Sequence, residues 1–144
     1  MAGQKGNTFI NDLLKLIFNA TAIANICDNA AASPLTNLYV SLHTADPTAS
    51  GNQTSSEATY TSYARVAVAR SGSGWTVSGQ SVVPAATVTF PQATGGTNTI
   101  THFGIGTASS GTGKLLYAGP VTPNISVSTG VTPQLTTSTS VTEA

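Results

Sequence analysis

The chain has 144 residues, a formal net charge of zero and only 7% charged side chains, where about 25% is usual. Its five cations are scattered along the chain, which argues against nucleic acids and anionic membranes as partners. Ser and Thr supply 40 residues, so we expect a folded protein with an uncharged, hydroxyl-covered surface that meets neighbouring copies in an assembly. A monomer solvated by its hydroxyl groups is the alternative.

Residues 7–24 are predicted to form a helix, with Asn7 or Thr8 as its N-cap. Apolar residues cover so much of this helix that it must pack against something, and we expect its own sheet, with a partner protein as the alternative. The main apolar stripe consists of Phe9, Leu13, Leu16, Ile17 and Ala20, widened by Ile10, Leu14 and Phe18. The first four of these are our candidate partner contacts on the helix.

After Pro34 the pattern of apolar residues changes to a period of two, which is typical of strands. In the first strand, Leu38, Val40 and Leu42 alternate with residues expected to face solvent, among them Ser41 and His43. A polar loop at 48–58 follows and is a candidate for exposure or contact. The further predicted strands are 63–70, 75–77, 82–90, 97–105, 115–117, 125–127 and 131–141.

This spacing predicts a mainly β fold, an antiparallel β-sandwich or jelly roll of about seven to eight strands with an N-terminal helix. Residues 1–33 form the predicted helical segment, and residues 34–144 the predicted sandwich domain. Asn11, Asp12 and Lys15 interrupt the apolar helix, so neither a secretion signal nor a membrane span is expected.

No combination of residues predicts catalysis, a metal site or a cofactor. His43 and His102 are the only histidines, and the single Cys27, expected to be a buried apolar residue, cannot build a zinc cluster. The stretch 106–114 lacks the first glycine and the final hydroxyl of a phosphate-binding loop, which indicates a hairpin loop. Arg65 and Arg70 are candidate partner contacts, because an arginine fork pairs with a carboxylate on a neighbour.

Three stretches resemble a family of short tailed-phage and prophage virion proteins: LYVSLHTADP (38–47), YARVAVAR (63–70) and VTFPQATGGTNTITHFGIGTASSGTGKLLYAG (88–119). Members of this family are called tail-fibre-like or particle-decorating proteins. The resemblance implies a β-sandwich subunit of the virion that carries no catalytic residues and is made in the cytoplasm of the host bacterium.

Three roles are compatible with this resemblance. We expect a capsid decoration or cement protein that binds in many copies to the head and contacts other copies of itself and the major capsid protein. A tail, tail-fibre or baseplate protein with tail proteins as its partners is the first alternative. A carbohydrate-binding module for host attachment is the second, with Trp75, Tyr60 and Tyr63 as the stacking residues.

Overall fold

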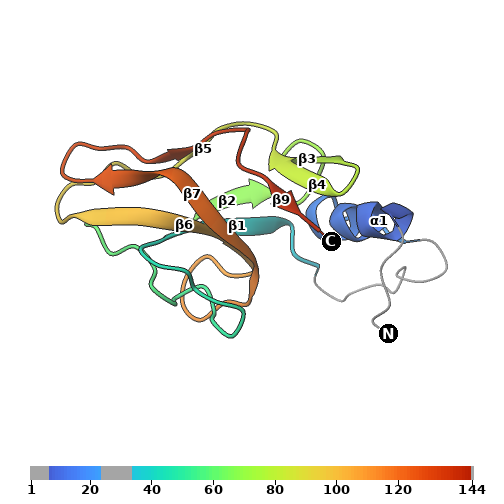
Figure 1. Ribbon diagram of the computed structural model, residues 1–144, viewed down its shortest axis with the longest axis horizontal. Coiled ribbons are helices and arrows are strands. Elements are labelled where there is room, and N and C mark those ends of the chain that lie inside the picture. Colours follow the sequence, from blue (N-terminus) through green and yellow to red (C-terminus); the bar gives the residue numbers. More distant parts are fainter. Residues whose placement is uncertain (1–6, 24–33, 144) are drawn as a thin grey trace.

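The computed structural model describes residues 7–23 and 34–143, which form one helix and nine strands. Figure 1 shows an elongated body with the helix at one end and the start of β6 and the end of β7 at the other. The elements are α1 (Asn7–Phe18), β1 (Asn37–His43), β2 (Val66–Ala69), β3 (Trp75–Ser78), β4 (Ser81–Pro84), β5 (Val88–Thr89), β6 (Asn98–Gly106), β7 (Leu115–Val127), β8 (Gln134–Leu135) and β9 (Val141–Thr142).

All strand pairs are antiparallel, as predicted for a mainly β fold. The main sheet has the order β2-β1-β6-β7, and two small sheets, β3-β4-β9 and β5-β8, complete a sandwich-like arrangement. Apolar side chains from all three sheets meet in one core, in which Trp75, Phe90 and Ile100 are at most 1% exposed. Burial of these large side chains is the main favourable contribution to folding.

The longest strand, β7, combines two segments that the sequence predicted as separate strands at 115–117 and 125–127. Strand β6 pairs with both halves, and a register shift between Ile100 and His102 accommodates the irregular part between them. Pro120 and Pro123 lie in this middle part, and they obscured the strand because proline cannot donate a hydrogen bond in a sheet. Conversely, the predicted strand 82–90 is divided between β4 and β5.

Helix α1 is shorter than predicted and ends at Phe18 rather than near residue 24. Ala20 has a φ of 54°, a left-handed conformation that turns the chain out of the helix. The N–H groups of Asn19 and Thr21 both donate to the carbonyl oxygen of Lys15, at 2.9 and 3.1 Å. These bonds satisfy the carbonyl that the end of the helix would otherwise leave free.

The helix packs on β3 and β4 of its own chain, as expected. Its buried residues are Ile10, Leu14 and Phe18, which the sequence placed at the margin of the apolar stripe. The Phe18 ring meets Trp75 edge-on, with ring centroids 4.8 Å apart. The predicted boundary after residue 33 and the predicted burial of Cys27 lie outside the described residues. No helix in the described ranges is long and apolar enough to cross a membrane.

Candidate functional site

One face of β1 carries the core residues Leu38, Val40 and Leu42. The loop that follows β1 covers the opposite face, so Ser41 and His43 are fully buried instead of facing solvent. His43 Nδ1 lies 2.8 Å from the carbonyl oxygen of Ser55, and His43 Nε2 lies 2.8 Å from Ser41 Oγ. Because a carbonyl oxygen only accepts, Nδ1 is the donor and Nε2 accepts from the Ser41 hydroxyl. Burial lowers the pKa of His43, which holds the ring in its neutral form.

A partly buried ion pair between Arg65 and Glu57 holds the other end of the same loop. Arg65 Nε and Nη2 donate to the two carboxylate oxygens of Glu57 at 2.6 and 2.8 Å, and the Arg65 side chain is only 2% exposed. The guanidinium also donates to the carbonyl oxygens of Ala108 and Gly111 at 3.0 and 2.8 Å. Arg65 therefore joins the loop after β1 to the loop between β6 and β7.

Gln53 completes this connection, which we call the loop clamp and define as Gln53, Glu57 and Arg65. The Gln53 side chain is fully buried, and its Oε1 accepts a hydrogen bond from the Ala108 N–H at 2.9 Å. A Cβ on Gly106 or Gly113 would lie 2.2 or 2.1 Å from the Gln53 side chain, so both positions require glycine. From the sequence, Gln53 and Glu57 were expected only to lie within a polar loop, because the partner of Gln53 is 55 positions away and no local pattern pairs Glu57 with Arg65.

Arg70, the other arginine expected to contact a partner, is engaged at the end of α1. Its guanidinium donates to the carbonyl oxygens of Leu16 and Ile17 and, at 3.3 Å, of Leu35. A positive charge at the C-terminal end of a helix is favourable because the free carbonyls carry partial negative charge. Both arginines thus have partners within the chain, and their contact with another protein stays a prediction.

The four candidate contacts on α1 differ in accessibility. Phe9 is 39% exposed, Leu13 and Leu16 are half-buried, and Ile17 packs against the core. Outside the helix, Leu35 is the other large apolar residue with high exposure among the described residues, at 43%. Phe9 is therefore the most accessible of the four.

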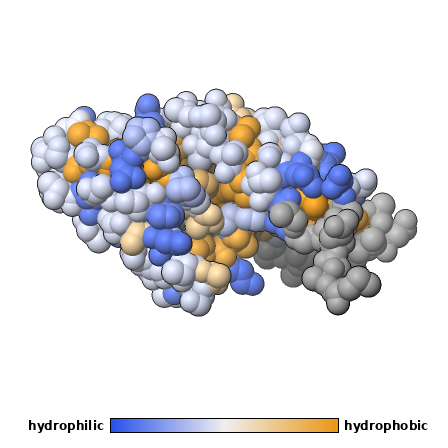
Figure 2. All heavy atoms as spheres, viewed as in Figure 1, coloured by the Kyte–Doolittle hydropathy of each residue, from blue (hydrophilic) through white to orange (hydrophobic). Residues whose placement is uncertain are grey.

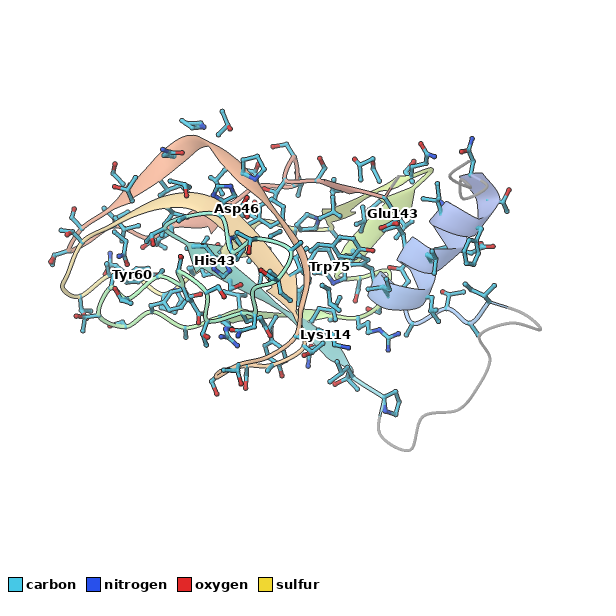
Figure 3. All side chains as sticks on the ribbon, turned by 60° about the horizontal axis from the view of Figure 1, so that its bottom comes forward. His43, Asp46, Tyr60, Trp75, Lys114 and Glu143 are labelled. Carbon is cyan, nitrogen blue, oxygen red and sulfur yellow. The ribbon has the colours of Figure 1, made fainter. Side chains whose placement is uncertain are left out.

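The three aromatic residues considered for sugar stacking are used for packing. Trp75 and Tyr60 are 1% and 2% exposed, and Figure 3 shows Trp75 in the interior, toward the helix end of the molecule. Tyr63 stacks on Phe90 with centroids 6.5 Å apart, and its hydroxyl donates to Glu57 at 2.9 Å. Trp75 and Tyr60 are therefore not accessible to a sugar, and the half-buried Tyr63 has its ring packed on Phe90.

A groove of about 710 Å³ lies between the edge of β7 and the segment that leads from β8 to β9. One wall is formed by residues 120–126 and the other by residues within 134–140, and the buried Phe103 also lines the groove. Figure 1 shows these two segments next to each other on the side of the sandwich. The lining contains hydroxyl, amide and apolar side chains but no charged one.

No group of three or more His, Cys, Asp or Glu residues that could hold a metal ion occurs in the part of the chain that the structure describes. The family model described as Podophage GP4 fiber I protein gp80 matches residues 11–142. The chain belongs to this family. No curated protein matches it.

Membership in the gp80 fibre family makes this chain a structural protein of a phage particle, of the tail-fibre-like kind. It is located in the virion, as the resemblance implied. The match extends beyond residues 38–119, which carried the resemblance, and includes most of α1 and the strands up to β9. The description of the family names a fibre protein. The match is therefore closer to the tail-fibre alternative than to the expected role in capsid decoration.

Proposed function

We propose that this chain is a subunit of a tail fibre, which acts through binding and assembly and has no catalytic role. The observation that carries this proposal is the match of the gp80 fibre family over residues 11–142. The pale surface in Figure 2, where most of the visible face is neither strongly hydrophilic nor strongly hydrophobic, agrees with close contact between neutral proteins. In addition, both ring nitrogens of the buried His43 are occupied by Ser41 and Ser55, as expected for a structural histidine.

The end of the molecule that carries α1 is our candidate for the attachment of neighbouring proteins, either tail proteins or other copies of this chain. Figure 1 shows α1 at one end of the elongated body, where a contact would leave the opposite end free. On this helix Phe9 is 39% exposed, and the half-buried Leu13 and Leu16 supply further apolar surface. Burial of these side chains in an interface would contribute about 25 cal/mol for each Å² removed from water.

The location on the particle is tested by labelling intact virions with antibodies against the chain and by measuring its copy number by quantitative mass spectrometry. A fibre subunit labels the tail and occurs in a small multiple of the tail symmetry. Label distributed over the head, with a copy number close to that of the major capsid protein, would instead establish a decoration role and refute our proposal.

The role of the helix is tested with particles that carry Phe9→Ser. Less of this variant should be incorporated into virions, while the purified protein melts near the temperature of the wild-type chain, because Phe9 is exposed. Thr8→Ala, which changes an exposed neighbour on the same helix, is the matched control and should assemble normally. Normal incorporation of both variants would show that attachment occurs elsewhere.

A further inference from the structure

The groove beside β7 contains polar side chains for which the described part of the chain supplies no hydrogen-bond partner. No hydrogen bond of the Thr122, Asn124 or Ser126 side chain to another described residue is present, although all three line the groove. On the opposite wall the Gln134 amide nitrogen donates to Thr89 Oγ1 at 3.2 Å, which leaves its Oε1 free to accept. The groove therefore presents both donors and acceptors to a ligand.

The wall formed by residues 134–140 is held in place by local hydrogen bonds. Thr136 Oγ1 and Ser138 Oγ are 2.6 Å apart, and the Thr139 N–H donates to the Thr136 carbonyl oxygen at 3.0 Å. On the facing wall, β7 pairs with β6 at Pro120, Ile125 and Ser126, while residues 121–124 between them have no paired residue in β6. Both walls are thus held at several points before a ligand binds, which limits the conformational entropy lost on binding.

The chemistry of the lining restricts the ligand. Because no charged side chain is present, nothing there compensates the cost of removing a phosphate, carboxylate or ammonium group from water. Apolar side chains, among them the half-buried Val121 and Ile125, alternate with the hydroxyl and amide groups along this part of β7. A ligand with neutral hydroxyl groups and an apolar C–H face matches both kinds of surface.

An extended peptide is the other neutral ligand that could lie along the edge of a sheet. Such a peptide binds through the backbone N–H and C=O groups of the edge strand. Pro120 and Pro123 remove two donors from this part of β7, which is a common means of preventing strand addition at an edge. The groove is therefore better suited to a ligand that side chains recognise.

From these observations we propose that the groove between residues 120–126 and 134–140 is a binding site for a neutral saccharide. The Asn124 and Gln134 amides bind sugar hydroxyls, and the apolar side chains of the groove contact the C–H face of the ring. A volume of about 710 Å³ is within the range of small-ligand sites. This site differs from the aromatic residues first considered for sugar binding, and it does not depend on the location of the protein on the particle.

The proposal is tested by amide NMR titration of the full chain with glucose, galactose, N-acetylglucosamine and short oligomers of each. At least one neutral sugar should shift the resonances of residues that line the groove, in a saturable manner and with little effect of salt. Asn124→Ala should weaken this binding by about tenfold or more, as expected for the loss of hydrogen bonds. Ser126→Trp, which places a large ring in the groove, should abolish it.

The matched control is Asn37→Ala, which removes the same side chain from β1 outside the groove and should bind as the wild-type chain does. The proposal is overturned if no neutral sugar shifts groove residues, or if only glucuronic acid binds. It is also overturned if groove resonances shift with protein concentration alone, because a second copy would then occupy the groove. None of these results would change the location of the protein in the virion, which antibody labelling tests separately.

Discussion

Arg65 and Glu57 form a partly buried, two-pronged ion pair, with Nε–Oε1 and Nη2–Oε2 distances of 2.6 and 2.8 Å. The pair lies where the loop after β1 meets the loop between β6 and β7, because Arg65 also donates to the Ala108 and Gly111 carbonyl oxygens. Two irregular segments without regular pairing thus obtain a fixed position. The chain has only five basic and five acidic residues, so this one pair uses a large share of its charged side chains.

We predict that Arg65→Ala lowers the free energy of unfolding by about 3 kcal/mol, since it leaves the Glu57 carboxylate partly buried without its partner. For a domain of this size, such a loss lowers the melting temperature by about 10 °C, which calorimetry can measure. Arg65→Lys keeps the positive charge but cannot bind both carboxylate oxygens in the same way. Its free energy of unfolding should lie between those of Arg65→Ala and the wild-type chain. Lys114→Ala, at an exposed residue, is the control. A stability of Arg65→Ala equal to that of the control would disprove the role of the pair.

The glycines around Gln53 provide a second test of the loop clamp. Gly106→Ala places a Cβ 2.2 Å from the Gln53 side chain, which must then leave the Ala108 N–H to which it is bound. We expect a loss of about 2 kcal/mol in urea unfolding, as is typical of overpacking. Gly72→Ala is the control, because a Cβ there has no atom within 4 Å, and it should change stability by less than about 0.5 kcal/mol. Equal effects of the two substitutions would contradict this account.

Local patterns in the sequence predicted most of the strands but not what covers them. The alternation in β1 correctly indicated that Leu38, Val40 and Leu42 are buried. The same rule placed Ser41 and His43 in solvent, and it was wrong because residues from the following loop cover this face. An alternating pattern reports one apolar face, but it does not reveal a polar face that is buried by hydrogen-bonded groups.

The two arginines show the same limit for the candidate site. Each was predicted to contact a partner protein from its chemistry alone. In the structure Arg65 pairs with a residue eight positions away, and Arg70 binds carbonyl groups of α1 more than fifty positions away. Nothing local in the sequence indicates these partners, since long-range contacts depend on the complete fold. The groove beside β7 was missed for the same reason, because its two walls come from separate segments.

Arg70 connects α1 to the rest of the protein, so its loss should release the helix more than the sheets. In Arg70→Ala, the amides of residues 10–18 are expected to exchange hydrogen about tenfold faster or more, while those of β1 and β6 change little. The reason is the loss of two charge-assisted bonds to the carbonyls of Leu16 and Ile17. Lys15→Ala removes another positive charge from the last turn and is the control. Uniform acceleration across the whole chain would show that Arg70 supports global stability instead.

His43 should make the stability of the protein depend on pH in the mildly acidic range. Burial lowers its pKa below the ordinary value of 6.5, to which it returns on unfolding. Above about pH 6.5 His43 is neutral in both the folded and the unfolded chain, and its full contribution to the free energy of unfolding is present. As the pH falls below about 6.5, the unfolded chain binds the proton first, so stability decreases. One such group contributes at most about 1.4 kcal/mol for each pH unit.

The contribution of His43 can be separated from that of other groups with His43→Asn, whose amide can still donate to the Ser55 carbonyl oxygen but does not titrate. The variant is less stable than the wild-type chain near neutral pH because it loses the bond from Ser41. Urea unfolding between about pH 5 and about pH 7.5 should show this difference shrinking as the pH falls, since only the wild-type chain loses the histidine contribution. A constant difference over that range would mean that His43 keeps its ordinary pKa, and that burial under the loop does not exclude the proton.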